Sequence, residues 1–416
     1  MKTTDVLIIG GGAVGVCAAY FLNKSGYKVI LVEQAGIGSG ASHGNLGLVV
    51  PSHSVPLSNP EAISHGLGWM FKPESPFYIK PRLDIPLMKW LWEFWRASGE
   101  GSVHKAIPLI RDMSLLSLSL FNDLDQLLDF NFQKRGLVSL CRTSKGLEEN
   151  YQEALLLSSY GLKIDKQTPG SFAPLLGDLE VKALGGLFFK QDGHLPPSKF
   201  VRRLADHLRS TDVTFLTDTQ VSGFTTSNGC ITSTETSAGP IKAGTVVVTA
   251  GCWSSFLTKQ LDVKLLIQPA KGYSITLKRP SRWPEIPLML FESRVAVTPM
   301  GDFLRIGGTL ELSGMDFKIN PRRIAAILKA IPNYLPSLDI GTNDILETWC
   351  GLRPCTPDGL PFLGKVSNVS NLVIAAGHAM IGISLAPATG KLVSQIVGAE
   401  ETDVDISQFA VNRFGA

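Results

Sequence analysis

The sequence lacks the usual signatures of metal-binding, membrane-spanning and nucleic-acid-binding proteins. Its six cysteines are scattered over 416 residues without a CxxC pair, so we expect no metal site and reduced thiols in a cytoplasmic compartment. No run of about twenty apolar residues is present, which argues against a membrane-spanning helix. The formal net charge is +3 and there is no basic run, so nucleic acid is not an expected partner.

Aromatic residues make up 8% of the chain, yet four of the seven tryptophans lie close together. They are Trp69, Trp90, Trp92 and Trp95, and they stand beside Met70, Phe71, Met88 and Phe94. One interpretation is an aromatic core or the wall of a substrate cavity. The other is peripheral contact with the inner face of a membrane, where amphipathic segments rich in tryptophan bind the lipid boundary.

The start of the chain has the pattern of a dinucleotide-binding βαβ unit. Residues 5–10 form a short β-branched apolar run, which is typical of a buried parallel strand. Residues 10–15 follow as GxGxxG, and apolar residues then recur with helical spacing until Gly26. Residues 29–32 predict a second strand, and Glu33 stands at its end, where such units carry a ribose-binding acid. The pattern therefore predicts that the chain binds a dinucleotide.

Each part of this unit has a physical role. Gly10 allows a sharp turn off the strand, Gly12 lets backbone N–H groups approach a pyrophosphate, and Gly15 lets helix and strand pack closely. The N-terminus of the helix then presents its positive dipole end to the phosphates. The carboxylate of Glu33 would accept hydrogen bonds from ribose hydroxyls and repel a 2′-phosphate, which disfavours an NADP-type ligand. NAD and FAD both satisfy this pattern.

Two features beyond the βαβ unit indicate where the ligand lies. Residues 36–47 contain five glycines, so we expect this loop to bring its backbone close to the ligand. Three buried apolar strands end in glycine, at 7–12, 246–251 and 372–377. We expect these strands to be parallel, with their carboxyl ends meeting at one ligand, as in open α/β sheets.

Several further motifs follow one another along the chain. They are residues 41–47 (ASHGNLG), 249–254 (TAGCWS), 269–274 (PAKGYS), 349–359 (WCGLRPCTPDG), and Gly377-His378 with Gly382. Together with the GxGxxG turn and Glu33, this set resembles the D-amino acid dehydrogenase branch of the FAD-dependent D-amino acid oxidase superfamily, which also contains glycine and sarcosine oxidases. The resemblance covers nearly the whole chain.

The resemblance implies FAD as the cofactor and assigns residues to it. Those implied for the ADP half are Gly10, Gly12, Ala13, Val14, Gly15, Glu33 and Gln34. Those implied for the pyrophosphate and the isoalloxazine are Gly40, Ala41, Ser42, Asn45, Gly47 and Leu48. The adenine side and the C-terminal part of the site are assigned to Val221, Ala250, Gly251, Trp253, Gly377, His378, Gly382 and Ile383.

The candidate catalytic residues are two that the resemblance implies and two histidines that could shape the pocket or tune protonation. Arg353 matches the arginine that binds the substrate carboxylate, and Tyr273 is similar to a residue near the substrate. His53 and His378 complete the candidate set, and His194 is a further candidate to shape the pocket. A guanidinium suits a carboxylate because two parallel N–H donors match two oxygens.

The predicted fold class is α/β, with a Rossmann-like FAD-binding domain interleaved with an α+β substrate domain built on an antiparallel sheet. Alternating β-formers at 264–277 and 291–309 predict the strands of the second domain. Helices are expected at 107–128, 147–160, 321–331 and 383–397, and from an N-cap at Ser198. The predicted boundaries are 1–55, 193–262 and 341–416 for the FAD-binding domain, and 56–192 and 263–340 for the substrate domain.

The implied reaction is oxidative deamination of a D-amino acid, or oxidation of a cyclic imino acid such as D-proline, by hydride transfer from Cα to flavin N5. The electrons would pass to a quinone or another acceptor. One alternative is an oxidase of the same superfamily that uses oxygen and releases hydrogen peroxide. Another is a nucleotide-binding protein without catalytic activity, which Arg353 beside a substrate-like cap disfavours.

Overall fold

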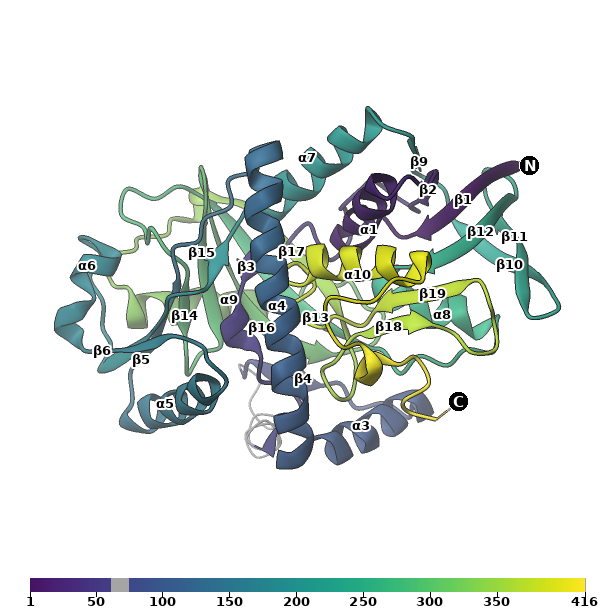
Figure 1. The fold of residues 1–416 in the computed structure, drawn as a ribbon. Coiled ribbons are helices and arrows are strands. Elements are labelled where there is room, and N and C mark those ends of the chain that lie inside the picture. The colour runs from purple at the N-terminus through teal and green to yellow at the C-terminus, as the bar shows by residue number, and fades with distance from the viewer. Residues whose placement is uncertain (61–74, 416) are drawn as a thin grey trace.

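The computed structural model describes residues 1–60 and 75–415 (Figure 1). Two large sheets lie on either side of the long helix α4 (Glu100–Leu128). Of the tryptophan-rich stretch, Trp69, Met70 and Phe71 fall outside the described residues. The other three tryptophans lie on α3 (Ile85–Ala97).

The first sheet has a parallel core. Its strands are β1 (Lys2–Ile9), β2 (Val29–Val32), β9 (Val213–Leu216), β10 (Val221–Ser227), β11 (Cys230–Thr236), β12 (Ile241–Val248), β18 (Phe362–Lys365) and β19 (Leu372–Ala376). Strands β9, β2, β1, β12 and β19 are parallel neighbours in this order, and β18 pairs antiparallel with β19. The predicted convergence of three glycine-ended strands is therefore confirmed, since β1, β12 and β19 lie side by side and end at the same edge.

The second sheet is mainly antiparallel. Its strands are β4 (Phe77–Ile79), β5 (Leu137–Cys141), β6 (Ile164–Gln167), β7 (Gly185–Phe189), β13 (Gln268–Lys278), β14 (Leu288–Leu290), β15 (Val295–Met300), β16 (Phe303–Leu312) and β17 (Ile345–Cys355). The order runs β17-β13-β16-β15-β14-β5-β7-β6, and β4 adds to β16. A two-stranded pairing of β3 (Leu48–Val49) with β8 (Gly193–His194) stands apart from both sheets.

The remaining helices cover the two sheets. They are α1 (Ala13–Lys24), α5 (Ser144–Ser159), α6 (Ala173–Leu176), α7 (Pro197–Arg209), α8 (Ser254–Lys259), α9 (Pro321–Tyr334) and α10 (Ala386–Gly398). Short 3-10 turns occur at η1 (Pro51–His53), η2 (Pro169–Ser171), η3 (Gly251–Trp253), η4 (Thr342–Asp344) and η5 (Ser407–Phe409). Helices α1, α7 and α10 pack with α4 in one hydrophobic core.

The interleaving differs from the predicted boundaries at two places. Residues 341–416 were expected to belong to the FAD-binding domain, but β17 pairs along its length with β13 of the antiparallel sheet. Residues 56–192 were assigned to the substrate domain, yet α4 packs Ile110, Met113 and Phe121 into the core of the first domain. In both cases the pattern of apolar residues shows that the segment is buried. It does not show which sheet or which hydrophobic core the segment packs against.

Several helix ends also differ from the sequence expectation. Helix α4 begins at Glu100, seven residues before the expected start, and continues through Pro108. Ser198 is not the N-cap of α7, because the helix begins at Pro197, and proline is favoured in the first helical turn. The Ser198 hydroxyl instead donates a hydrogen bond to the His43 carbonyl, at 3.4 Å. Helix α10 begins at Ala386, and residues 382–385 form the turn that leads into it.

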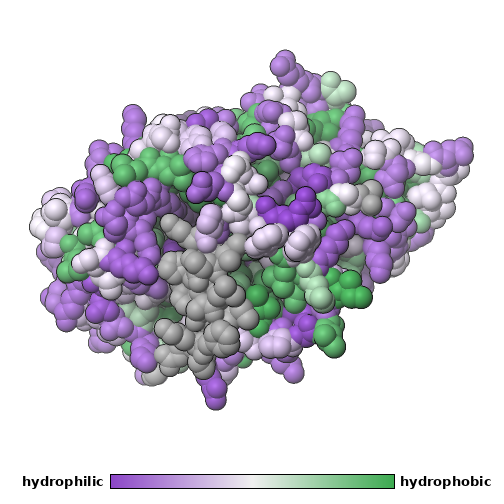
Figure 2. All heavy atoms as spheres, turned by 90° about the horizontal axis from the view of Figure 1, so that it is seen from below, coloured by the Kyte–Doolittle hydropathy of each residue, from purple (hydrophilic) through white to green (hydrophobic). Residues whose placement is uncertain are grey.

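Helix α3 divides its aromatic residues between core and surface. Trp90 is buried, and its Nε1 donates to the carbonyl oxygen of Cys355 at 2.9 Å. Trp92 and Trp95 are 57% and 59% exposed. Seen from below, hydrophobic residues gather on the surface over α3 (Figure 2). Within the described ranges, no helix is both long and apolar enough to cross a bilayer.

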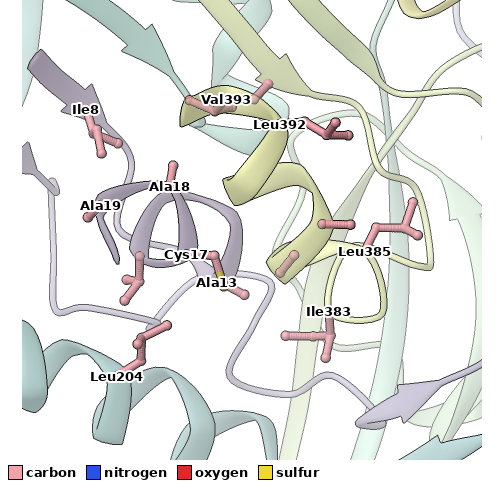
Figure 3. Packing of buried hydrophobic residues seen from close by; sticks show 14 of the residues in the cluster. Ile8, Ala13, Cys17, Ala18, Ala19, Leu204, Ile383, Leu385, Leu392 and Val393 are labelled. Carbon is pink, nitrogen blue, oxygen red and sulfur yellow. The ribbon is translucent and has the colours of Figure 1, made fainter. Parts of the chain in front are cut away.

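The two ends of the chain meet where α1 packs against α10 (Figure 3). Leu385, Leu392 and Val393 contribute to the core from the C-terminal side, opposite small residues of α1. A Cβ on Gly390 would come within 2.5 Å of the Cys17 carbonyl carbon and 2.8 Å of the Ala18 nitrogen. Glycine is therefore required at position 390 for the two helix backbones to approach this closely.

Replacing Gly390 by alanine should destabilise the protein. The added Cβ collides with backbone atoms, which cannot rotate away, so α10 must shift at a cost of about 1–3 kcal/mol. Urea unfolding monitored by circular dichroism measures this loss. The matched control is Gly398→Ala at the end of the same helix, where the new Cβ faces the flexible Glu400 side chain. Equal unfolding midpoints for the two variants would contradict the close-packing explanation.

Candidate active site

A large cavity runs from the N-terminus of α1 to the antiparallel sheet. Its volume is about 1050 Å³, at the upper limit of cavities that hold drug-sized ligands. Gly12 and Glu33 line one end, and Tyr273 and Arg353 line the other. The predicted nucleotide-binding and substrate-binding residues thus face one continuous space.

The βαβ turn forms the first end of the cavity. Gly10 has a φ of 112°, and a Cβ on Gly15 would lie 1.9 Å from the Gly10 carbonyl oxygen, so both positions require glycine. A Cβ on Gly12 would meet the Ser42 Oγ at 3.5 Å and nothing closer, so the space above this backbone is open. The Glu33 carboxylate accepts hydrogen bonds from the Gly11 N–H at 2.7 Å and the Ala35 N–H at 3.1 Å.

The glycine-rich loop joins the two domains over the cavity. Ser42 Oγ accepts a hydrogen bond from the Ala13 N–H at 3.1 Å, which caps the start of α1. On the other side, the Arg305 Nη1 on β16 donates to the carbonyl oxygens of His43 and Asn45, at 2.8 and 2.9 Å. Sequence reasoning missed Arg305, because no local motif marks a residue that acts from another strand.

The carboxyl ends of β12 and β19 complete the middle of the cavity. Ala250, Gly251 and Trp253 follow β12 and line it. His378 follows β19 and also lines it, with Nε2 at 3.0 Å from the Thr389 Oγ1. Gly377 has a φ of 88°, and it turns the chain beside Thr356 without lining the cavity.

Arg353 lies across β13 at the second end of the cavity. A Cβ on Gly272 would fall 2.0–2.3 Å from its guanidinium atoms, so glycine leaves the room that this side chain occupies. Arg353 Nη1 donates to the Thr309 carbonyl oxygen at 2.8 Å, and no carboxylate of the described residues forms an ion pair with it. Burial lowers the pKa of the guanidinium, which nonetheless keeps its charge at neutral pH. This arrangement leaves a fixed cation open to an anionic ligand.

Tyr273 belongs to a buried polar network on the face of β13 opposite to the Arg353 guanidinium. Its hydroxyl donates to the Glu311 Oε2 at 3.0 Å. The Lys271 Nζ lies 3.6 Å from the Glu311 Oε1 and 2.8 Å from the Asp316 Oδ2. Burial and the Glu311 carboxylate raise the pKa of Tyr273, so its phenol stays protonated and remains a hydrogen-bond donor.

Comparisons with known proteins agree with this geometry. The DAO family, described as FAD dependent oxidoreductase, matches residues 5–396. A curated protein named D-amino acid dehydrogenase from Allorhizobium ampelinum is 30% identical over 99% of both chains. The chain belongs to the DAO family of FAD-dependent oxidoreductases.

Solved structures share the fold of this family member along its whole length. Glycine oxidase from Geobacillus kaustophilus superposes with a TM-score of 0.80 at 22% identity, covering 99% of both chains. L-proline dehydrogenase from P. horikoshii superposes with a TM-score of 0.79 at 20% identity, covering 99% of this chain and 98% of that one. The predicted superfamily, the Rossmann-like fold and FAD as the cofactor are confirmed.

The residues of this DAO-family chain fit FAD. The open backbone at Gly12 and the N-terminus of α1 suit a pyrophosphate, and Glu33 is fixed at the position of a ribose acceptor. The cavity then continues along Ser42 and Asn45 to the two strand ends, as an elongated dinucleotide requires.

Most residues that sequence reasoning assigned to the cofactor line the cavity. These are Gly10, Gly12, Ala13, Val14, Glu33, Gln34, Gly40, Ala41, Ser42, Asn45, Leu48, Val221, Ala250, Gly251, Trp253, His378, Gly382 and Ile383. Gly15, Gly47 and Gly377 do not line it. Gly15 and Gly47 provide close packing instead, since a Cβ would collide with a carbonyl oxygen, of Gly10 and Leu195 respectively. Contact with the cofactor itself stays a prediction for the lining residues.

The candidate histidines have different surroundings. His53 and His378 line the cavity, and burial lowers the pKa of each to about 4, so both rings are neutral at pH 7. Arg294 contributes to the effect at His53. His194 is buried outside the cavity, in the β8 pairing, and burial lowers its pKa to about 4 as well. His194 therefore does not line the pocket it was expected to shape.

A buried carboxyl group supports the cavity wall next to His53. Asp192 accepts hydrogen bonds from the Ser52 N–H at 3.1 Å and the Ser52 hydroxyl at 2.5 Å. Burial raises the pKa of Asp192 to about 7, against an ordinary value of 3.8. Its protonated form therefore persists to near neutral pH.

The substitution Asp192→Asn should stabilise the protein above neutral pH relative to the wild type. Between the unfolded pKa near 3.8 and the folded pKa of about 7, the unfolded carboxyl ionises while the folded one stays protonated. Wild-type stability therefore falls as pH rises through this window, by at most about 1.4 kcal/mol per pH unit. The amide oxygen of asparagine accepts from the Ser52 N–H, its NH2 group donates to the Ser52 hydroxyl oxygen as a protonated acid does, and it has no proton to lose.

Urea unfolding at about pH 5 and about pH 8 measures the effect. The difference between Asp192→Asn and wild type should increase toward the higher pH. Asp218→Asn provides the control, because Asp218 is an exposed turn residue with a positive φ that asparagine tolerates. A pH-independent difference at Asp192 would show that this carboxyl ionises normally.

Proposed function

We propose that this chain is a D-amino acid dehydrogenase that oxidises the Cα–N bond of a D-amino acid or a cyclic imino acid. The observation that carries the proposal is the position of Arg353, whose guanidinium has no carboxylate partner among the described residues and faces the same cavity as the FAD-binding turn. The curated relative named D-amino acid dehydrogenase supports the same substrate class.

In this proposal Arg353 binds the substrate carboxylate and sets its orientation. Two N–H donors of the guanidinium would bind two carboxylate oxygens, while the remaining bond to the Thr309 carbonyl holds the side chain in place. Tyr273 lines the same end of the cavity, while its protonated hydroxyl is bound to Glu311. Bound FAD supplies the hydride acceptor. Fixing the carboxylate orients Cα for transfer, and orientation contributes more here than a strong base.

The neutral histidines suit an amine substrate. His53 and His378 carry no charge at pH 7, so they do not repel the amino group. The Nε2 of His378 is engaged by Thr389. The imine product would hydrolyse in water to a 2-oxo acid and ammonia, unless it is cyclic.

Anaerobic and aerobic assays of the FAD-loaded protein test the proposal. D-alanine and D-proline should abolish the visible absorbance of the flavin without oxygen, whereas L-alanine should not. An artificial quinone should restore the absorbance. Rapid aerobic reoxidation with stoichiometric hydrogen peroxide would favour the oxidase alternative, and no reduction by D-amino acids, glycine or sarcosine would reject the enzyme assignment as stated.

Arg353→Met should lower kcat/KM for D-alanine by about a hundredfold or more, because a buried charge-assisted contact with the substrate is lost. Stopped-flow reduction of the flavin measures the effect, and the flavin-to-protein absorbance ratio checks that FAD stays bound. Arg135→Met is the control, since Arg135 forms an exposed ion pair with Glu285. Similar activity in the two variants would exclude Arg353 from carboxylate binding.

We also propose that the electron acceptor is a quinone reached at the inner face of a membrane through α3. Ile85, Met88, Trp92 and Trp95 expose apolar surface on this helix, and Lys89 is exposed among them. An amphipathic helix with tryptophan and basic residues suits an anionic lipid surface. A lipid-soluble acceptor would then be available without a membrane-spanning segment.

The double substitution Trp92→Gln with Trp95→Gln should weaken binding to anionic phospholipid vesicles by about tenfold, because less apolar surface enters the lipid. Vesicle co-sedimentation measures it. The control Phe303→Gln removes another exposed aromatic residue, on β16. Equal binding by the double variant and the wild type, or no binding by either, would contradict the membrane proposal.

A further inference from the structure

A second arginine enters the substrate end of the cavity. Arg294 lies in the turn between β14 and β15 and lines the cavity with Arg353. Its guanidinium carbon stands 4.4 Å from the centre of the Phe291 ring. Among the described residues it forms no ion pair. Glu153 also lines the cavity and has interactions of its own, but no ion pair of the described chain joins it to Arg294.

The turn that carries Arg294 is held firmly in place. The neighbouring Glu292 accepts hydrogen bonds from the Arg142 and Thr143 N–H groups, each at 2.9 Å, and from the Tyr334 hydroxyl at 2.5 Å. Arg294 itself has a φ of 51°, a left-handed conformation that is uncommon for residues with a side chain. The backbone position of Arg294 is therefore set by the fold, and its guanidinium stacks on Phe291.

The two arginines lie on opposite sides of one segment of strand β16. Val295, next to Arg294, pairs with Gly308 on β16. On the other edge, the Arg353 guanidinium lies over Gly272 and donates to the Thr309 carbonyl. Since β16 separates β15 from β13, the two sites lie about two strand spacings, or roughly 10 Å, apart. His53 lines the same region, and the charge of Arg294 contributes, after burial, to lowering the pKa of His53.

We infer that Arg294 binds a second anionic group of the substrate, so that the site prefers amino acids with a carboxylate side chain. Two fixed cations facing one cavity repel each other, and a ligand with two carboxylates would offset both charges. A substrate with one carboxylate would leave the half-buried Arg294 without an anionic partner among the described residues. This inference rests on the proposed function and specifies its substrate class.

Pairs of substrates that have nearly the same shape but differ in the charge of the side chain test the inference. D-glutamate differs from D-glutamine, and D-aspartate from D-asparagine, by a carboxylate in place of an amide. For the wild type we expect kcat/KM to favour the acidic member of at least one pair by about ten- to a hundredfold, as for a charge-assisted contact. Arg294→Met should lower this ratio by a similar factor, whereas Arg294→Lys should retain part of it.

Arg279→Met serves as the control, because Arg279 stacks on Trp283 at the surface and does not line the cavity. Its acidic-to-amide ratio should equal that of the wild type. A wild-type ratio of one or less for both pairs, or a ratio that Arg294→Met leaves unchanged, would overturn the inference while neutral D-amino acids still reduced the flavin.

A binding experiment keeps the test independent of turnover. Isothermal titration with glutarate and with butyrate compares two carboxylates with one, without any reaction. Glutarate should bind the wild type more tightly than butyrate, and Arg294→Met should remove the difference. If no D-amino acid reduced the flavin, the proposed function would fail. Equal affinities of the wild type for the two acids would reject the second anion site in either case.

Discussion

The structure depends on the parallel pairing of β1, β12 and β19, which come from the beginning, the middle and the end of the chain. Their shared register places the ends of all three strands at one edge. At that edge the positive φ angles of Gly10, Gly251 and Gly377 turn the backbone away. The turns at Gly10 and Gly251 line the cavity, and Gly390 lets the backbones of α1 and α10 approach each other at Cys17 and Ala18.

The second constraint joins this edge to the antiparallel sheet. Arg305 binds two carbonyl groups of the glycine-rich loop, and a Cβ on Gly44 would lie 2.0 Å from the Trp349 ring. A Cβ on Gly351 would meet the other side of the Trp349 side chain, at 1.9 Å. Gly44 thus packs a domain interface, although the loop as a whole was predicted to approach the ligand. The position of Arg353 relative to the FAD-binding turn follows from this interface.

Sequence reasoning found what is encoded locally and in periodic patterns. The βαβ unit, Glu33 and the three glycine-ended strands have short-range signals, and the resemblance added Arg353 and Tyr273. No strand was predicted at β17, and no local signal indicates its pairing, because its partner β13 lies over sixty residues earlier in the chain. Arg305 and Asp192 gave no signal, since each acts on a backbone segment that is close in space and distant in sequence.

Residues with strained backbone gather along the cavity. Apart from glycine, asparagine and aspartate, the described residues with positive φ are Arg294, Thr309, Ala379 and Ala399. The first three line the cavity. Such conformations cost about 1–3 kcal/mol each and persist where the surrounding structure enforces them. At Thr309 the strained backbone carries the carbonyl that holds Arg353. The packing around these residues enforces the three conformations, so the folded chain carries their cost before any ligand binds.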